Sequence, residues 1–327
     1  MSALRATFDL KVRAVLGPDP ADARDVRILN RIARWSAGDG RAKLEYEADP
    51  RHAEIAVAAL GLEAAKGVST PMVKPRTEDY VGVARSLTKE EVKLYRSVTV
   101  RIQYLAQDRP DLQFASKERA RHMKDPNERD LVALKRIGRY LVTRPRLLMV
   151  FEQQAMPEKM VVYVDTDHAG CLVTRKSTTG LALVFGKHCV RSSSNTQSDI
   201  ALSSGESEFY GAVKAASVGL GAVAMAADLG IKVELELRMD STAGKAISER
   251  QGLGRTRHIA TRFLWVQQRV ARGDLRITKW PGKDNPADLM TKALPEASVV
   301  RSLLALRCMF AQGRSSHALQ VQAGAAA

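Results

Sequence analysis

Between residues 158 and 295 short apolar segments alternate with helical ones, and their order restricts the possible folds. Val162 and Val164 alternate with Val161, Tyr163 and Asp165, which is the period of a strand. An Ala-rich stretch ends in Gly230, as a long helix does. The predicted elements are strands at 160–165, 180–187 and 188–194, a helix at 205–230, a strand at 233–239, helices at 242–250 and 256–272, a strand at 275–280 and a helix at 286–294. This order predicts a mixed α/β sheet with flanking helices.

Single carboxylates stand at the ends of these strands or at the starts of these helices. Asp165 ends the first strand, Glu208 lies in the first turns of the long helix, Asp240 ends the fourth strand and Asp288 starts the last helix. Such positions can converge on one edge of a sheet, where a cluster of acids would bind a cation. A turn or helix cap explains an isolated Asp at a strand end equally well, and spacing alone does not show convergence.

The charge of the chain points to a polyanionic partner. Its 327 residues include 51 Lys and Arg against 36 Asp and Glu, a formal net charge of +15. Aromatic residues make up only 5%, which disfavours a platform that stacks single-stranded bases. Three widely spaced cysteines form no disulfide framework or zinc motif. No signal peptide or membrane-spanning apolar run is evident, so we expect an intracellular protein, in the cytoplasm or nucleus, with no membrane partner.

Three further regions surround this segment. Residues 1–75 are predicted to be mixed α/β, with one strand face at Val26, Ile28 and Ile32, another strand over 44–48 and a helix that Asp49 and Pro50 begin. Residues 76–157 are predicted to be helical and basic, with an apolar stripe at Leu134, Ile137 and Leu141. Residues 296–327 are expected to form a flexible tail.

A series of motifs resembles one known family. In order they are YVDTDHAG (163–170), TRKSTTG (174–180), ALSSGESEFYGA (201–212), MDSTAGKAI (239–247), RTRHI (255–259) and NPADLMTKAL (285–294). The series is similar to the ribonuclease H domain of copia-type retrotransposon Pol polyproteins. STPMVKP (69–75), YRSVTVRIQYLAQDRPDLQFA (95–115) and LKRIGRYL (134–141) resemble the segment between reverse transcriptase and that domain.

The resemblance implies both a fold and a metal site. It implies a ribonuclease H-like five-stranded mixed sheet in residues 158–295, preceded by a smaller reverse-transcriptase C-terminal region that is α/β in 1–75 and a helical, thumb- or connection-like segment in 76–157. It also implies that Asp165, Glu208, Asp240 and Asp288 hold two Mg²⁺ ions, with Mn²⁺ as a possible substitute. Glu206 remains an alternative to Glu208, and Asp167 an alternative to Asp165.

Polar and basic residues of the same motifs are candidates for nucleic-acid contacts. Ser241 and Thr242 can bind a phosphate at a helix N-terminus or only cap the helix, and capping is the preferred role for Thr242. Asn195 and Gln197 can read 2′-hydroxyl groups or be plain loop residues. The other candidates are Arg255, Arg257 and His258, for which helix-start packing is the alternative at His258, and Lys135 and Arg139, which a solvated helix face also explains.

The expected activity is hydrolysis of the RNA strand of RNA–DNA hybrids by the C-terminal part of such a polyprotein. His168 departs from the family, which usually has Trp there, and the segment KWPGKDNPAD that ends at Asp288 lacks the histidine that cellular ribonucleases H often have there. No YVDD or FVDD polymerase motif occurs, so we expect no DNA synthesis without a separate polymerase part as partner. The alternatives are a nucleic-acid-binding remnant that does not cleave, and an integrase- or transposase-like nuclease, which would need a zinc module that the His and Cys spacing does not supply.

Overall fold

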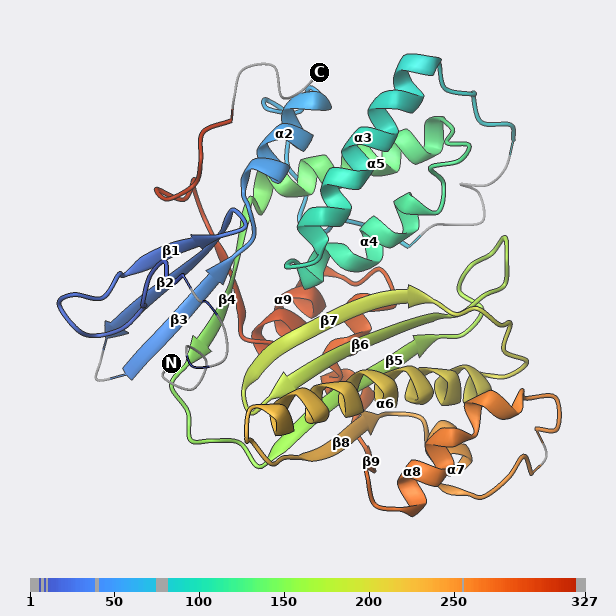
Figure 1. The fold of residues 1–327 in the computed structure, drawn as a ribbon. Coiled ribbons are helices and arrows are strands. Elements are labelled where there is room, and N and C mark those ends of the chain that lie inside the picture. The colour runs from blue at the N-terminus through green and yellow to red at the C-terminus, as the bar shows by residue number, and fades with distance from the viewer. Residues whose placement is uncertain are drawn as a thin grey trace.

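Two five-stranded sheets organise the protein, each with its own helices (Figure 1). The computed structural model describes residues 6, 9, 11–38, 41–74, 82–254 and 256–321. The first sheet has the strand order β1-β2-β3-β4-β10, and every neighbouring pair is antiparallel. Its strands are β1 (Asp25–Ile28), β2 (Arg31–Gly38), β3 (Arg41–Glu47), β4 (Arg146–Glu152) and β10 (Cys308–Ala311).

The first sheet corrects two expectations. The strand face predicted for Val26, Ile28 and Ile32 is divided between β1 and β2, because Leu29 and Asn30 adopt positive φ angles and form the turn of a hairpin. The tail predicted for 296–327 contains α9 (Glu296–Ala305) and β10, which pairs with β4 and buries Cys308. The chain order is therefore interrupted: β10 returns to a sheet whose other strands lie far upstream.

Four helices pack beside the first sheet. They are α2 (Arg51–Ala59), α3 (Lys89–Ala106), α4 (Pro110–Ala120) and α5 (Glu128–Thr143). The stripe of Leu134, Ile137 and Leu141 on α5 is buried in their shared core, as its spacing predicts. The described residues of this predicted helical region, 82–157, are thus mainly helical, with β4 as a strand among them.

The second sheet has the predicted mixed character. Its order is β7-β6-β5-β8-β9; β5–β6 and β6–β7 are antiparallel, whereas β5–β8 and β8–β9 are parallel. The strands are β5 (Lys159–Asp167), β6 (Thr178–Phe185), β7 (His188–Thr196), β8 (Glu234–Met239) and β9 (Arg276–Lys279). This arrangement confirms the five-stranded mixed sheet with flanking helices.

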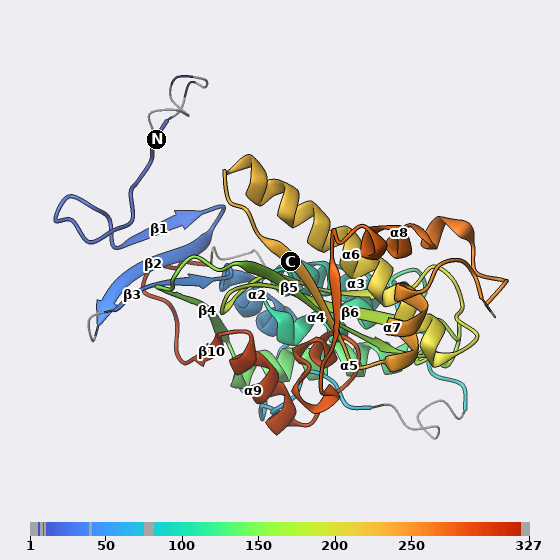
Figure 2. The ribbon, with the colours of Figure 1, turned by 90° about the horizontal axis from the view of Figure 1, so that it is seen from below.

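Helices cover both faces of the second sheet (Figures 1 and 2). One face carries α6 (Ser204–Asp228), α7 (Thr242–Glu249) and α8 (Trp265–Ala271), which share a core with Val162 and Val164 of β5. The 3-10 turn η4 (Pro286–Met290) and α9 pack on the other face against Ala182 and Val184. Among the described residues, α6 alone is long and apolar enough to cross a membrane by length and composition; here it lies on the sheet.

Two predicted helices are shorter in the structure. The helix expected over 256–272 is divided into the 3-10 turn η2 (Thr261–Phe263) and α8, and the segment before η2, in which His258 contacts Glu206 of α6, is not helical. The last helix, expected over 286–294, is the turn η4, preceded by the turn η3 (Gly282–Asp284).

Candidate active site

Three carboxylates meet at one edge of the second sheet. Asp165 lies near the C-terminal end of β5, Asp240 directly follows β8, and Glu208 comes from the second turn of α6. One oxygen of each lies within 4.8 Å of the others. Because β5 and β8 are parallel neighbours, their C-terminal ends reach the same edge, where α6 begins. The convergence that spacing could not show is therefore present.

Burial and mutual repulsion disfavour the ionised state of Glu208 and Asp240. Asp165 is 3% exposed and Glu208 is 5% exposed, and the Oε2 atom of Glu208 is buried without a hydrogen-bond partner. Burial, together with the charge of Asp165, raises the pKa of Glu208 to about 8. The same two causes raise the pKa of Asp240. A cation among these oxygens would remove the penalty.

Asp288 lies beside this cluster, next to Asp165. Burial and the charge of Asp165 raise the pKa of Asp288 to about 7. The ammonium of Lys292 lies 3.1 Å from Asp288 Oδ1 and 3.5 Å from Asp165 Oδ2. The Thr291 hydroxyl donates to Asp165 Oδ2 at 2.5 Å. Asn285 Nδ2 donates to the carbonyl of Val164 and fixes the segment that carries Asp288 to β5.

The two candidate glutamates on α6 face different surroundings. Glu206 is 1% exposed; its Oε1 accepts a hydrogen bond from Tyr210, and its Oε2 lies 2.8 Å from His258 Nε2. Burial disfavours its charge, but these hydrogen bonds outweigh burial and lower the pKa of Glu206. Glu208, not Glu206, is grouped with Asp165 and Asp240. Asp165 rather than Asp167 occupies the corresponding position on β5.

The structure supports some of the roles predicted for the polar residues and contradicts others. Ser241, not Thr242, caps α7: its Oγ accepts from the Gly244 amide, whereas Thr242 Oγ1 accepts from Lys279. Gln197 is not an open loop residue, because it is 9% exposed and its Nε2 donates to Thr179 and to the Ser207 carbonyl. Asn195 Nδ2 donates to Ser193 Oγ.

The basic candidates lie in two places. Arg257 and His258 are exposed in the segment before η2, and Arg255 lies outside the described residues. Lys135 is exposed on α5, and Arg139 Nε donates to the Lys66 carbonyl. Neither α5 residue contacts the acidic cluster.

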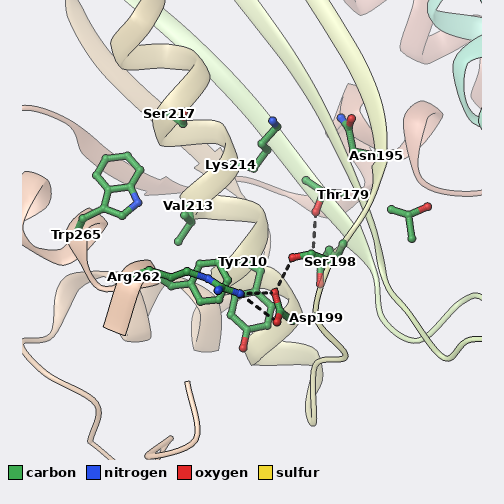
Figure 3. Close-up of a pocket in the computed structure, with 13 residues that line it drawn as sticks. Thr179, Asn195, Ser198, Asp199, Tyr210, Val213, Lys214, Ser217, Arg262 and Trp265 are labelled. Atoms are coloured by element: carbon green, nitrogen blue, oxygen red, sulfur yellow. Dashed lines mark hydrogen bonds and ion pairs between the residues drawn. The ribbon is translucent and has the colours of Figure 1, made fainter. Parts of the chain in front are cut away.

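A pocket of about 570 Å³ opens between β7, α6 and η2 (Figure 3). Asn195, Lys214 and Arg262 line it, with Trp265 on the α8 side. Arg262 extends toward Asp199 and donates to both of its carboxylate oxygens at 3.2 Å. Thr179, also in the wall, pairs with Thr166, the residue that follows Asp165. The pocket therefore begins one strand away from the acidic cluster and offers cationic and amide groups.

Two side-chain contacts at the site were not predicted from the sequence. Lys292 follows Asp288 by four residues, a spacing that can place the two on one helical face and could have indicated the pair. The contact between His258 and Glu206 spans 52 residues, and no local pattern indicates it.

The donor set suits a hard divalent cation. Carboxylate oxygens on separate, well-packed elements, one of them buried and unpartnered, are ligands that Mg²⁺ and Mn²⁺ accept. Asp165, Glu208 and Asp240 would hold such an ion, with Asp288 beside Asp165. A mixed sheet with this acidic edge defines a ribonuclease H-like nuclease fold.

Comparison with known sequences shows to which proteins the chain is related. The retrovirus-related Pol polyprotein from transposon RE1 of Arabidopsis thaliana is 30% identical over 234 residues, which are 70% of this chain and 16% of that polyprotein. The corresponding polyprotein from transposon TNT 1-94 of Nicotiana tabacum is 29% identical over 189 residues, 57% of this chain and 14% of the polyprotein. The chain is thus related to one segment of transposon Pol polyproteins, which confirms the copia-type resemblance. No protein-family profile matches the chain.

Solved structures provide a weaker likeness. LC11-RNase H1, isolated from compost, is 17% identical with a TM-score of 0.32, and the match covers 45% of this chain and 99% of that enzyme. The same enzyme in complex with an RNA/DNA hybrid gives a TM-score of 0.29 at 18% identity, over 41% and 94% of the two chains. The fold class stated above follows from the strand order, not from these scores.

Proposed function

We propose that the protein is a divalent-metal-dependent endonuclease that hydrolyses the RNA strand of RNA–DNA hybrids. The convergence of Asp165, Glu208 and Asp240, with an unpartnered buried oxygen on Glu208, carries this proposal. Two Mg²⁺ ions are its proposed cofactors, with Mn²⁺ as a substitute. The relationship to transposon Pol polyproteins supports it, since a hybrid is the kind of substrate that reverse transcription produces.

The residues of the chain have separate tasks in this reaction. When bound, divalent ions activate a water molecule and stabilise the leaving oxygen of the phosphodiester. Four acids on a rigid sheet edge would hold these ions in fixed positions: Asp165, Glu208, Asp240 and Asp288. Thr291 and Asn285 hold Asp165 and the backbone of β5 in place.

The substrate is proposed to lie across the pocket and the acidic edge. Asn195, Lys214 and Arg262 of the pocket can donate to backbone phosphates of one strand, while the other strand reaches the acids. Arg257 and His258 are exposed in the segment that His258 joins to Glu206 of α6, and Lys135 and Arg139 on α5 are proposed as further phosphate contacts. Ser241 contributes through the N-terminus of α7 that it caps. We expect the protein to act inside the cell and beside the polymerase part of the polyprotein.

The test uses the full chain, a labelled RNA–DNA hybrid and Mg²⁺. We expect wild type to release RNA fragments with 3′-hydroxyl and 5′-phosphate ends, and Asp240→Asn to bind the hybrid without cleaving it. Asp274→Asn is the control, because Asp274 is an exposed acid paired with Arg269, and neither residue belongs to the cluster or lines the pocket. If wild type and Asp240→Asn bind equally and cleave equally poorly, the protein is a binding remnant and the catalytic proposal is wrong.

A further inference from the structure

One ammonium group lies against the acidic cluster. Lys292 Nζ is 3.1 Å from Asp288 Oδ1 and 3.5 Å from Asp165 Oδ2. The side chain of Asp165 is 5% exposed, whereas that of Lys292 is 41% exposed. The ammonium of a half-exposed side chain thus reaches from the protein surface to carboxylates that are buried in the sheet edge.

The backbone places Lys292 at this position. Asn285 Nδ2 is bonded to the Val164 carbonyl, and Thr291, the residue before Lys292, donates to Asp165 and to the Asp288 carbonyl. These contacts attach both ends of the segment 285–291 to β5. The ammonium is therefore directed at the acids by the fold rather than by a chance rotamer of a surface lysine.

The cluster has few other sources of positive charge in contact with it. Among the residues that the structure describes, the recorded ion pairs of Asp165 and Asp288 are both made with Lys292, and none is recorded for Glu208 or Asp240. Lys292 consequently balances part of the charge that a divalent cation would also balance. Two cations attracted to the same carboxylates repel each other, so they compete.

We propose that Lys292 is a built-in competitor of divalent cations: its ammonium occupies Asp165 and Asp288 until an ion displaces it, and it thereby sets the ion affinity of the site. The proposal rests on the proposed function in one respect, that the cluster takes divalent ions. The half-exposed four-carbon side chain can swing into solvent without disturbing the core, as displacement requires.

The experiment measures ion binding by the full chain in the absence of nucleic acid. Isothermal titration calorimetry with Mg²⁺ and with Mn²⁺ compares wild type, Lys292→Gln and Lys292→Arg. We expect Lys292→Gln to bind roughly three- to tenfold more tightly than wild type, given a unit charge removed at short range near the surface. Lys292→Arg keeps the charge and should stay close to wild type.

Lys43→Gln is the matched control. Lys43 is also 41% exposed and forms an ion pair, at 2.7 Å with Glu45, but it lies in the first sheet. Its replacement changes the net charge by the same amount and should leave ion affinity unchanged. A gain in affinity shared by Lys43→Gln would attribute the effect to net charge and overturn the proposal.

Thermal melting gives a second readout that does not depend on activity. In metal-free buffer we expect Lys292→Gln to melt below wild type, because its carboxylates lose their counter-charge. Saturating Mg²⁺ should raise its melting temperature by more than it raises that of wild type. Equal ion affinity and equal Mg²⁺ shifts in the two proteins would overturn the competition.

The outcomes separate this inference from the proposed function. Tighter binding by Lys292→Gln together with no hybrid cleavage by any protein would support the competition and refute the nuclease. Cleavage by wild type together with unchanged or weaker ion binding by Lys292→Gln would do the reverse. Absence of ion binding in all variants would refute both.

Discussion

Buried acids are treated differently in the two halves of the molecule. In the first sheet and its helices they meet arginines: Glu47 contacts Arg34 and Arg146, and Asp111 lies 2.7 Å from Arg109. At the edge of the second sheet, Asp165, Glu208 and Asp240 face one another. Burial of a carboxylate against an arginine is a structural arrangement, whereas burial of carboxylates that face one another is costly and is expected where charge has a use.

The second sheet itself sharpens this contrast. Glu236, in the middle of β8, is 7% exposed and pairs with Arg238 and Lys159. Asp240, at the end of the same strand, has no recorded ion pair among the described residues. The difference therefore follows position at the sheet edge rather than the sheet as a whole.

Glu208→Gln should have the largest effect on function. We expect hydrolysis of the hybrid to fall by about 10³-fold or more, because a ligand of the ion site loses its charge. Folding stability in metal-free buffer should not fall, because one member of a repelling group is neutralised. Cleavage rates and urea unfolding curves measure the two effects; loss of stability with retained cleavage would contradict the contrast.

Asp111→Asn should have the opposite profile. Arg109 is 1% exposed, so loss of its partner leaves a buried guanidinium with too little counter-charge, and Tyr140 loses a carboxylate acceptor. Breaking such a buried pair costs about 3–5 kcal/mol of unfolding free energy. Urea unfolding measures that loss, while hybrid cleavage per folded molecule should equal wild type. Replacing Arg109 by Met as well should recover part of the stability.

The pH dependence of stability provides a third test. Burial raises the pKa of Glu208 from its ordinary value of 4.5 to about 8, so within that window the folded chain keeps a proton that the unfolded chain releases. Folding then takes up protons, and stability in metal-free buffer should decrease as the pH rises from about 4.5 to about 8. Glu208→Gln should flatten the slope of melting temperature against pH. An identical slope in both proteins would show that Glu208 does not carry it.

Sequence patterns predicted those parts of the site that depend on local geometry. Alternation along β5 placed Asp165 near a strand end, and the parallel neighbours β5 and β8 then fixed where Asp240 lies. Patterns failed where distant segments meet. The flexible tail was wrong because β10 pairs with β4, and the open loop position expected for Gln197 was wrong because its amide is buried against Thr179 and Ser207. The family resemblance had already favoured Glu208 over Glu206, and the fold adds a physical reason, since His258 from another loop contacts Glu206.

The smallest expected effect lies on α5, far from the acids. Lys135 is exposed there, and Arg139 is partly engaged by the Lys66 carbonyl, which accepts a hydrogen bond but leaves the charge in place. If these residues contact phosphates of the hybrid, Lys135→Gln should weaken hybrid binding about two- to threefold and reduce the slope of log affinity against log salt by about 1. Filter binding across a salt series measures both, with Lys43→Gln as the control of equal charge change. An unchanged slope would mean that the positive face of α5 is only solvated, and the nucleic-acid surface would then be confined to the second sheet, whose edge carries the acidic cluster.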